Sequence, residues 1–308
     1  LEDIHSPFLM KDMQLAVDRI ASAIENGEKI LVYGDYDVDG TTAVSLMYLY
    51  LSKIVEKKYL DFYIPDRYSE GYGISDEGIN FAKENGFSLI IALDCGIKAL
   101  DKIEYASSLG IDFIICDHHL PGEELPKAFA VLDPKRTDCR YPYKELSGCG
   151  VGFKLCQGLN TIYKIPENEL YELTDLLAIS IAADIVAMTG ENRVLAKLGL
   201  KTLRKTRKLG IRLLIPEEKI ATFDISNIVF EIAPKINAAG RISHGKAAVE
   251  LMISDNLKHA HQIVDDILNL NDSRRELDAN TTQSAFNQVI ETQQENNFTT
   301  VVYHNEWN

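Results

Sequence analysis

Short apolar segments that alternate with longer helical ones constrain the fold of this chain more than any other feature. Five such segments are rich in Ile, Val, Leu and Phe, and each closes on Gly, Asp, His or Pro: residues 29–37, 60–65, 88–96, 112–119 and 128–134. The stretches between the first four are long enough for one crossover helix each. Strands that are apolar on both faces and joined by helices predict a parallel sheet covered on both sides. The expected fold is therefore α/β, a doubly wound parallel sheet.

Polar residues with metal-ligand chemistry follow the predicted strands directly. They are Asp35, Asp37 and Asp39 after the first strand, Asp94 after the third, Asp117, His118 and His119 after the fourth, and Asp133 after the fifth. Open parallel sheets bind ligands beyond the carboxyl ends of their strands, so we expect one site there. Asp184 lies inside an apolar helical stretch, where a carboxylate needs a partner, most simply a metal.

Carboxylates and imidazoles together favour Mn²⁺, Fe²⁺ or Zn²⁺, and this set fits two ions about 3.5 to 4 Å apart that clamp a phosphoryl group. Taken one at a time, some of these residues have a simpler explanation than metal binding. One of Asp35, Asp37 and Asp39 can cap a helix or form a turn, and Asp94 can cap the helix expected near Lys98. An EF-hand is disfavoured, because Leu46 stands where the calcium loop requires Glu.

The length and the C-terminal pattern predict more than one structural unit. A chain of 308 residues is about twice the usual size of a domain. A polar stretch without Pro or Gly predicts a long connector helix that begins after an N-cap at Ser254 or Asp255, and FTTVVYH (298–304) is strand-like. We expect a catalytic domain over residues 1–254, the connector helix over 255–297, and over 298–308 the start of a second domain that is otherwise absent.

Charge and cysteine usage bear on partners and compartment. The formal net charge of −14 counts against nucleic acid as a partner, although bound divalent cations would offset it. Residues 193–212 hold eight basic and no acidic residues, which indicates either a solvated helix face or a cationic surface. Five cysteines without a CxxC pair, no apolar run of 18 residues and no signal-peptide pattern predict a soluble protein in the reducing cytoplasm, with no membrane contact.

The motifs DYDVDG, ALDCG, DHH and AADIV, in this order, resemble those of the DHH phosphoesterases. The further strings IPDRYSEGYG, LSGCGVGFKL, TGENR and KINAAGRI resemble, more narrowly, the RecJ exonucleases. The resemblance covers essentially the whole chain. Family members continue into a second domain with a glycine-rich GGGH-type motif that this sequence lacks, so the resemblance implies a catalytic-core fragment with reduced activity.

The resemblance also implies residue roles. Asp37 would bind one metal ion, Asp39, His118 and Asp184 the other, and Asp94 both; Tyr33 stands where some relatives have a metal-binding His, which would weaken the first site. His119 would contact the scissile phosphate and Asp117 would orient the imidazoles, as the two catalytic residues. Asp35 and Asp133 would either bind metal or support its ligands. Arg67 and Arg241 would clamp the DNA 5′-phosphate, and a surface ion pair with Glu70 is the simpler interpretation of Arg67.

The implied function is that of a metal-dependent phosphodiesterase, a hydrolase that degrades single-stranded DNA from 5′ to 3′ and releases 5′-mononucleotides in DNA repair and recombination. The implied cofactors are two divalent ions, Mn²⁺ or Mg²⁺, and the implied partners are single-stranded DNA, a single-strand-binding protein and a helicase. Two alternatives share these motifs: DHH enzymes that hydrolyse cyclic dinucleotides, short oligoribonucleotides or pyrophosphate, and replication factors that have lost metal ligands.

Overall fold

The computed structural model describes residues 3–242, 245–305 and Trp307, and it contains one five-stranded parallel sheet. The strands lie in the order β2-β1-β3-β4-β5. Their bounds are β1 Lys29–Gly34, β2 Leu60–Tyr63, β3 Phe87–Leu93, β4 Asp112–Cys116 and β5 Ala130–Leu132. The five predicted strands and the parallel α/β architecture are confirmed.

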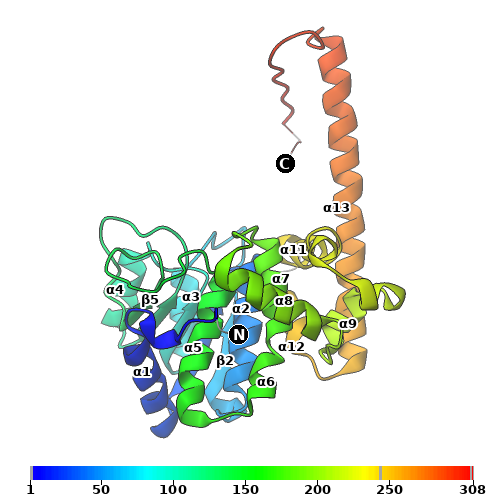
Figure 1. Ribbon diagram of the computed structural model, residues 1–308. Helices are drawn as coiled ribbons and strands as arrows, with labels where there is room; N and C mark the ends of the chain where they lie inside the picture. Colours follow the sequence, from blue (N-terminus) through cyan, green and yellow to red (C-terminus); the bar gives the residue numbers. More distant parts are fainter. Residues whose placement is uncertain (1–2, 243–244, 306, 308) are drawn as a thin grey trace.

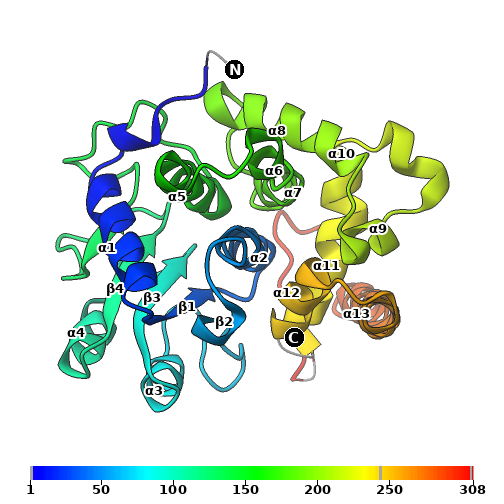
Figure 2. The same ribbon diagram turned by 90° about the horizontal axis from the view of Figure 1, so that it is seen from below.

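Helices cover both faces of the sheet. Successive side chains of a strand point to opposite faces, and here they enter two separate hydrophobic cores, one on each face. Figure 2 shows α1, α2 and α5 on one face and α3 and α4 on the other. The helices of the first face are α1 Met13–Glu25, α2 Val38–Leu51 and α5 Gly148–Tyr163, and α7 Thr174–Ala183 packs against α2 and α5. Those of the second face are α3 Asp76–Glu84 and α4 Leu100–Ser108. The sheet is therefore buried on both sides, as its apolar strands require.

The strand order places the start of the site at the centre of the sheet. The chain runs from β1 outward to β2 and then returns to the other side of β1 as β3. Gly34 at the end of β1 therefore lies beside Leu93 at the end of β3. This reversal of strand order is where open α/β sheets form their ligand-binding crevice.

Smaller helices extend the α2 side of the molecule. They are α6 Glu167–Tyr171, α8 Gly190–Leu203, α9 Leu209–Leu214, α10 Ile225–Asn227, α11 Ala233–Ile242 and α12 Gly245–Ile253. Short 3₁₀ turns occupy Pro7–Leu9, Lys57–Tyr59 and Glu217–Thr222, and Ile228–Ile232 form a π turn before α11. Among the described residues, no helix is both long enough and apolar enough to cross a membrane.

The predicted connector helix is present as α13, Leu257–Glu291, which Figure 1 shows projecting from the body of the molecule. Its first half is docked, with Ala260, Ile263, Val264 and Ile267 buried. The predicted N-cap was wrong by one or two residues, because the side chain of Asn256 accepts the hydrogen bond from His259 N (3.1 Å). The helix also ends six residues before the predicted Asn297.

The strand-like interpretation of FTTVVYH (298–304) was wrong. These residues form no strand, and Phe298, Val301 and Tyr303 are exposed. Tyr303 N and O instead bond the side chain of Gln288 on α13 (both 3.0 Å). β-propensity is realised only when a neighbouring strand takes up the backbone hydrogen bonds, and this segment has none among the described residues.

Candidate metal centre

The loop after β1 and the first turn of α2 carry Asp37 and Asp39. Asp37 is the N-cap of α2 and accepts a hydrogen bond from Gly40 N (2.9 Å), so the capping interpretation holds for this one residue. Asp39 accepts hydrogen bonds from Gly148 N (2.6 Å) and Cys149 N (2.9 Å) at the start of α5, and from Ser180 Oγ (2.6 Å) on α7. The free N–H groups at the start of α5 therefore hold the Asp39 carboxylate in place.

Asp94 directly follows β3, has a left-handed backbone (φ 59°) and is 1% exposed. Its N–H continues the ladder by donating to Cys116 O (2.8 Å). The capping interpretation of Asp94 is not supported, because α4 begins after Ala99 without a side-chain cap. A left-handed non-glycine residue costs about 1 kcal/mol or more, and such strain gathers at functional sites.

His118 brings three of these carboxylates together. Its Nε2 atom lies 3.2 Å from Asp94 Oδ1, 3.6 Å from Asp184 Oδ2 and 3.8 Å from Asp39 Oδ2. The ligand atoms of Asp39, His118 and Asp184 all lie within 4.8 Å of one another, and those of Asp94, His118 and His119 do likewise. Four segments far apart in the sequence therefore converge on one small volume.

Asp117 holds the two histidines in place. Its Oδ1 accepts hydrogen bonds from His118 N (2.7 Å) and from His119 N and Nδ1 (3.1 and 2.7 Å), and its Oδ2 accepts one from Ile97 N (2.9 Å). Although burial opposes it, this bonding keeps the pKa of Asp117 below its usual value. The bond to Asp117 raises the pKa of His119.

The centre holds more negative charge than its own side chains neutralise. Burial and the neighbouring carboxylates raise the pKa of Asp94 well above its usual value and that of Asp184 to about 7, and they also raise the pKa of Asp37. Among the described residues, no Lys or Arg forms an ion pair with these three carboxylates. Apart from the 3.2 Å approach of His118 Nε2, Asp94 Oδ1 is buried without a hydrogen bond, and so is His118 Nδ1.

These properties fit a bound divalent cation. Carboxylate oxygens and imidazole nitrogens are the donors that Mn²⁺ and Zn²⁺ accept, and a cation would supply the missing counter-charge. Asp37 lies outside the two groups of converging ligand atoms, but its carboxylate is near enough to Asp94 for its charge to help raise the pKa of Asp94, after burial and the charge of Asp39. The geometry is therefore most complete around Asp39, His118 and Asp184.

Asp35 directly follows β1, and Asp133 directly follows β5. Both are fully buried, and each has one carboxylate oxygen without a hydrogen-bond partner. Asp35 is approached by Gly73 N at 3.5 Å, and Asp133 accepts a hydrogen bond from Lys135 N (2.6 Å). Burial raises the pKa of each to about 7. Neither belongs to the two groups of converging ligand atoms, and a direct contact with metal stays a prediction for both.

A chain of ring contacts leads from Arg67 to His119. The Arg67 guanidinium lies over the Tyr36 ring (5.3 Å), and Tyr36 meets Tyr72 edge to face (6.1 Å). Glu70 does not pair with Arg67, because its carboxylate accepts hydrogen bonds from Tyr63, Asp66 N and Ser75. The backbone of Arg241 lies in α11, but its side chain is outside the described residues.

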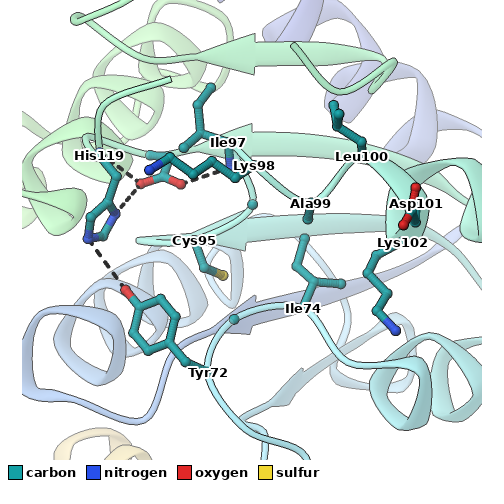
Figure 3. Close-up of a pocket in the computed structure, with 13 residues that line it drawn as sticks. Tyr72, Ile74, Cys95, Ile97, Lys98, Ala99, Leu100, Asp101, Lys102 and His119 are labelled. Atoms are coloured by element: carbon teal, nitrogen blue, oxygen red, sulfur yellow. Dashed lines mark hydrogen bonds and ion pairs between the residues drawn. The ribbon is translucent and has the colours of Figure 1, made fainter. Parts of the chain in front are cut away.

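A pocket of about 550 Å³ opens beside His119, and Figure 3 shows Tyr72 with its phenol directed at the His119 ring. Tyr72 Oη lies 3.4 Å from His119 Nε2, the nitrogen that Asp117 leaves free. Lys98 and Lys102 also line the pocket. Asp101 and Asp117 line it too, and Lys102 pairs with Asp76 (2.6 Å), so the pocket has mixed charge. A partly apolar pocket of this size next to an imidazole can receive one nucleotide.

Sequence reasoning missed the residues that support Asp39. Ser180 and the start of α5 lie more than 100 residues from Asp39 in the chain. The string SGCG was the available signal, because Ser147 caps α5 through Gly150 N (3.1 Å) and marks a helix N-terminus. The Tyr33 side chain is fully buried, and its hydroxyl donates a hydrogen bond to Gly73 O (2.9 Å). It is therefore directed at the loop that contains Gly73 and not at the candidate metal ligands.

Comparison with known proteins agrees with this geometry. Residues 29–181 match the model of the DHH family, N-terminal domain. The single-stranded-DNA-specific exonuclease RecJ of Bacillus subtilis is 44% identical over 292 residues, which cover 93% of this chain and 36% of the relative. The protein of the same name from Escherichia coli is 34% identical and is covered to 48%. This chain thus spans about a third to a half of the curated relatives that it matches.

A solved structure supports the same relationship in three dimensions. The crystal structure of an exonuclease RecJ bound to manganese superposes with a TM-score of 0.82 at 31% identity. The match covers 91% of this chain and 70% of that one. The chain therefore belongs to the DHH family and, within it, to the RecJ proteins.

Proposed function

We propose that this chain is the catalytic region of a metal-dependent exonuclease that degrades single-stranded DNA from 5′ to 3′ and releases 5′-mononucleotides. The observation that carries the proposal is the convergence of Asp39, Asp94 and Asp184 on His118, with His119 fixed beside them by Asp117. The names of the relatives supply the substrate class and the Mn²⁺ ion.

The ligand assignment follows the donor set. Asp39, His118 and Asp184 would hold one ion, Asp37 the other, and Asp94, which is close to both groups, would contact both. Bound ions of this kind supply Lewis acidity and neutralise the charge that develops on a phosphoryl group. The protein would orient the reacting phosphate: Asp117 fixes the His119 ring by its Nδ1, and Nε2, which contacts Tyr72 Oη, lies at the pocket.

Arg67 is the candidate clamp for the terminal 5′-phosphate. Its side chain is exposed on the loop before Tyr72, and a guanidinium can bind two phosphate oxygens at once. Arg241 is proposed as a second clamp for the 5′-phosphate, and this assignment rests on family membership alone. The same basis supports a catalytic domain over residues 1–254, cytoplasmic location, action in DNA repair and recombination, and cooperation with a single-strand-binding protein and a helicase.

The test is the product distribution from a 5′-phosphorylated, 3′-labelled single-stranded oligodeoxynucleotide with Mn²⁺. We expect shortening from the 5′ end with this chain and none with Asp94→Asn, which keeps the size of the side chain but removes its charge. Asp138→Asn is the matched control, because Asp138 pairs with Arg136 outside the metal centre. Cleavage that survives in Asp94→Asn, or products that start at the 3′ end, would contradict the proposal.

A further inference from the structure

We propose that the outer face of α8 and the loop after it bind the phosphate backbone of a single-stranded nucleic acid, apart from the metal centre. This surface consists of Arg193, Lys197, Lys201, Lys205 and Arg207, and we call it the basic stripe. It goes beyond the proposed function, because it contains no metal ligand and contacts none of the residues assigned to cleavage.

The spacing of the basic stripe places its cations in one row. Arg193, Lys197 and Lys201 are four residues apart on α8, and Lys205 continues the interval just beyond the helix. Residues four apart share one face of a helix and are separated by about 6 Å along its axis. All five side chains of the stripe are exposed. The result is a row of regularly spaced positive charges.

Packing of the opposite face of α8 against α7 keeps the basic stripe facing solvent. Leu195, Ala196 and Leu203 are buried, and the backbone at Gly199 lies so close to Thr174 and Ala178 of α7 that a Cβ would collide with them. Rotation of α8 would therefore break a close contact between the two helices. The stripe is held toward solvent by the fold itself.

The charges of the stripe have no acidic partner among the described residues, whereas those of its neighbours do. Lys208 pairs with the buried Asp175 (2.7 Å), and Arg212 pairs with Glu217 (3.5 Å). A solvated helix face usually alternates acidic and basic residues, and like charges four apart destabilise a helix. Unpaired cations side by side, in a chain with a net charge of −14, instead fit a surface that receives a polyanion.

Two surface pockets flank the basic stripe, one on each side. One, of about 880 Å³, is lined by Lys201, Lys205 and Arg207 and by apolar side chains that include Leu198 and Leu209. Four acidic residues line it as well, Glu169, Glu172, Asp175 and Asp255, and two of them are paired, Asp175 with Lys208 and Glu169 with Lys53. The other, of about 420 Å³, is lined by Arg193, Lys197 and Lys201 together with Met188 and Leu200. A single-strand binding surface combines cations that follow the phosphate backbone with aromatic side chains on which bases stack. Here the cations are those of the stripe, and Tyr171 in the larger pocket is the available aromatic side chain.

The position of the stripe favours nucleic acid over an acidic protein segment. α8 begins at Gly190, six residues after Asp184, so the row starts on the chain segment that leaves the metal centre. A strand whose end lies in the metal centre could continue along α8. The row itself consists of cations alone, so binding along it depends on charge, which suits a continuous phosphate backbone better than a peptide that binds through apolar anchors.

The experiment compares two quadruple variants of the full chain by fluorescence anisotropy in EDTA, where cleavage does not occur. The stripe variant carries K197Q, K201Q, K205Q and R207Q. The control carries K57Q, K58Q, K83Q and K127Q, four exposed lysines outside the stripe. Glutamine preserves helix propensity, and circular dichroism verifies that both variants are folded. The probes are labelled oligo(dT) strands of about 30 and about 6 nucleotides.

We expect the stripe variant to bind the long strand at least tenfold more weakly than the unmodified chain. The slope of log K against log salt should shrink by about 3, since each lost phosphate contact removes about 0.7 on a single strand. The control variant and the short strand should show neither change. Equal affinities and slopes for the two variants would overturn the proposal, and so would a failure of the unmodified chain to bind the long strand.

A third probe distinguishes the partner class. Polyglutamate of the same charge as the long strand should bind at least tenfold more weakly than the DNA. Equal binding of polyglutamate would overturn nucleic acid as the occupant and assign the stripe to an acidic polypeptide. All of these readouts are binding constants measured without metal, so they do not depend on whether the chain cleaves DNA.

Discussion

At the scale of single residues, the metal centre depends on the absence of a side chain at Gly148. A Cβ there would lie 2.5 Å from Asp94 Oδ1 and from Asp94 Cβ. The first residue of α5 must therefore be glycine for its N–H to reach Asp39 while Asp94 keeps its place. This close approach explains why a helix starts with a residue of poor helix propensity.

We predict that Gly148→Ala weakens Mn²⁺ binding at least tenfold, because the added methyl group displaces the Asp94 carboxylate. Isothermal titration with Mn²⁺ measures the effect. Gly150→Ala is the matched control on the same helix, since its nearest contacts would be an ordinary 3.4 Å. An unchanged affinity in Gly148→Ala would show that Asp94 is not a ligand.

Ile185 carries backbone strain next to Asp184. Its φ is 56°, and its side chain is 83% exposed. A β-branched residue in the left-handed region costs about 1 to 2 kcal/mol, and here little burial offsets that cost.

We predict that Ile185→Asn raises the free energy of unfolding by about 1 kcal/mol, since asparagine adopts the left-handed region more readily. Urea denaturation of the metal-free protein gives the value. Ile185→Val retains the branched Cβ and should leave the stability unchanged. Equal stability of the Asn and Val variants would mean that the strain at this position is negligible.

At the scale of elements, the strands were easier to predict than the ends of helices. β1, β3, β4 and β5 each contain an uninterrupted apolar run, a signal that does not depend on the rest of the fold. In the edge strand β2 the exposed Asp61 interrupts the run. The start of α13 was misplaced because Ser254, Asp255 and Asn256 are all good N-caps, and only the packed structure selects Asn256. In the segment 298–304 the residues have high β-propensity but form no strand, because a strand also needs a neighbouring strand to pair with.

α13 has two halves that should differ in their contribution to stability. Ile267 in the docked half is 1% exposed, whereas Ile290 in the projecting half is 59% exposed. We predict that Ile267→Ala lowers the free energy of unfolding by about 2 to 4 kcal/mol and that Ile290→Ala changes it by less than about 0.5 kcal/mol. Urea denaturation of both variants measures this, and similar losses would show that the projecting half is also packed.

At the scale of the whole molecule, the buried carboxylates couple stability to pH and metal. Asp35, Asp133 and Asp184 titrate near 7 in the metal-free fold, against about 4 in an unfolded chain. Between these values the folded protein binds more protons than the unfolded one, so the stability of the metal-free protein falls as pH rises.

We therefore predict that Mn²⁺ raises the melting temperature more at pH 8 than at pH 5.5, because protons compete with the ion at the lower pH. Thermal denaturation in EDTA and in Mn²⁺ at both pH values tests this. Asp184→Asn should reduce the increment at pH 8, and Asp138→Asn should not. An increment that is independent of pH would contradict the assignment of these buried carboxylates to a cation site.

The sequence by itself determined the layered α/β class and the residues with ligand chemistry, because apolar runs and the polar residues that end them are local patterns. Tertiary structure alone decided that β1 and β3 are neighbours, which brings Asp94 to Asp39, and that Ser180 and the start of α5 hold Asp39. Strand order and helix docking depend on the packing of segments distant in the chain. Local periodicity carries no information about those pairings.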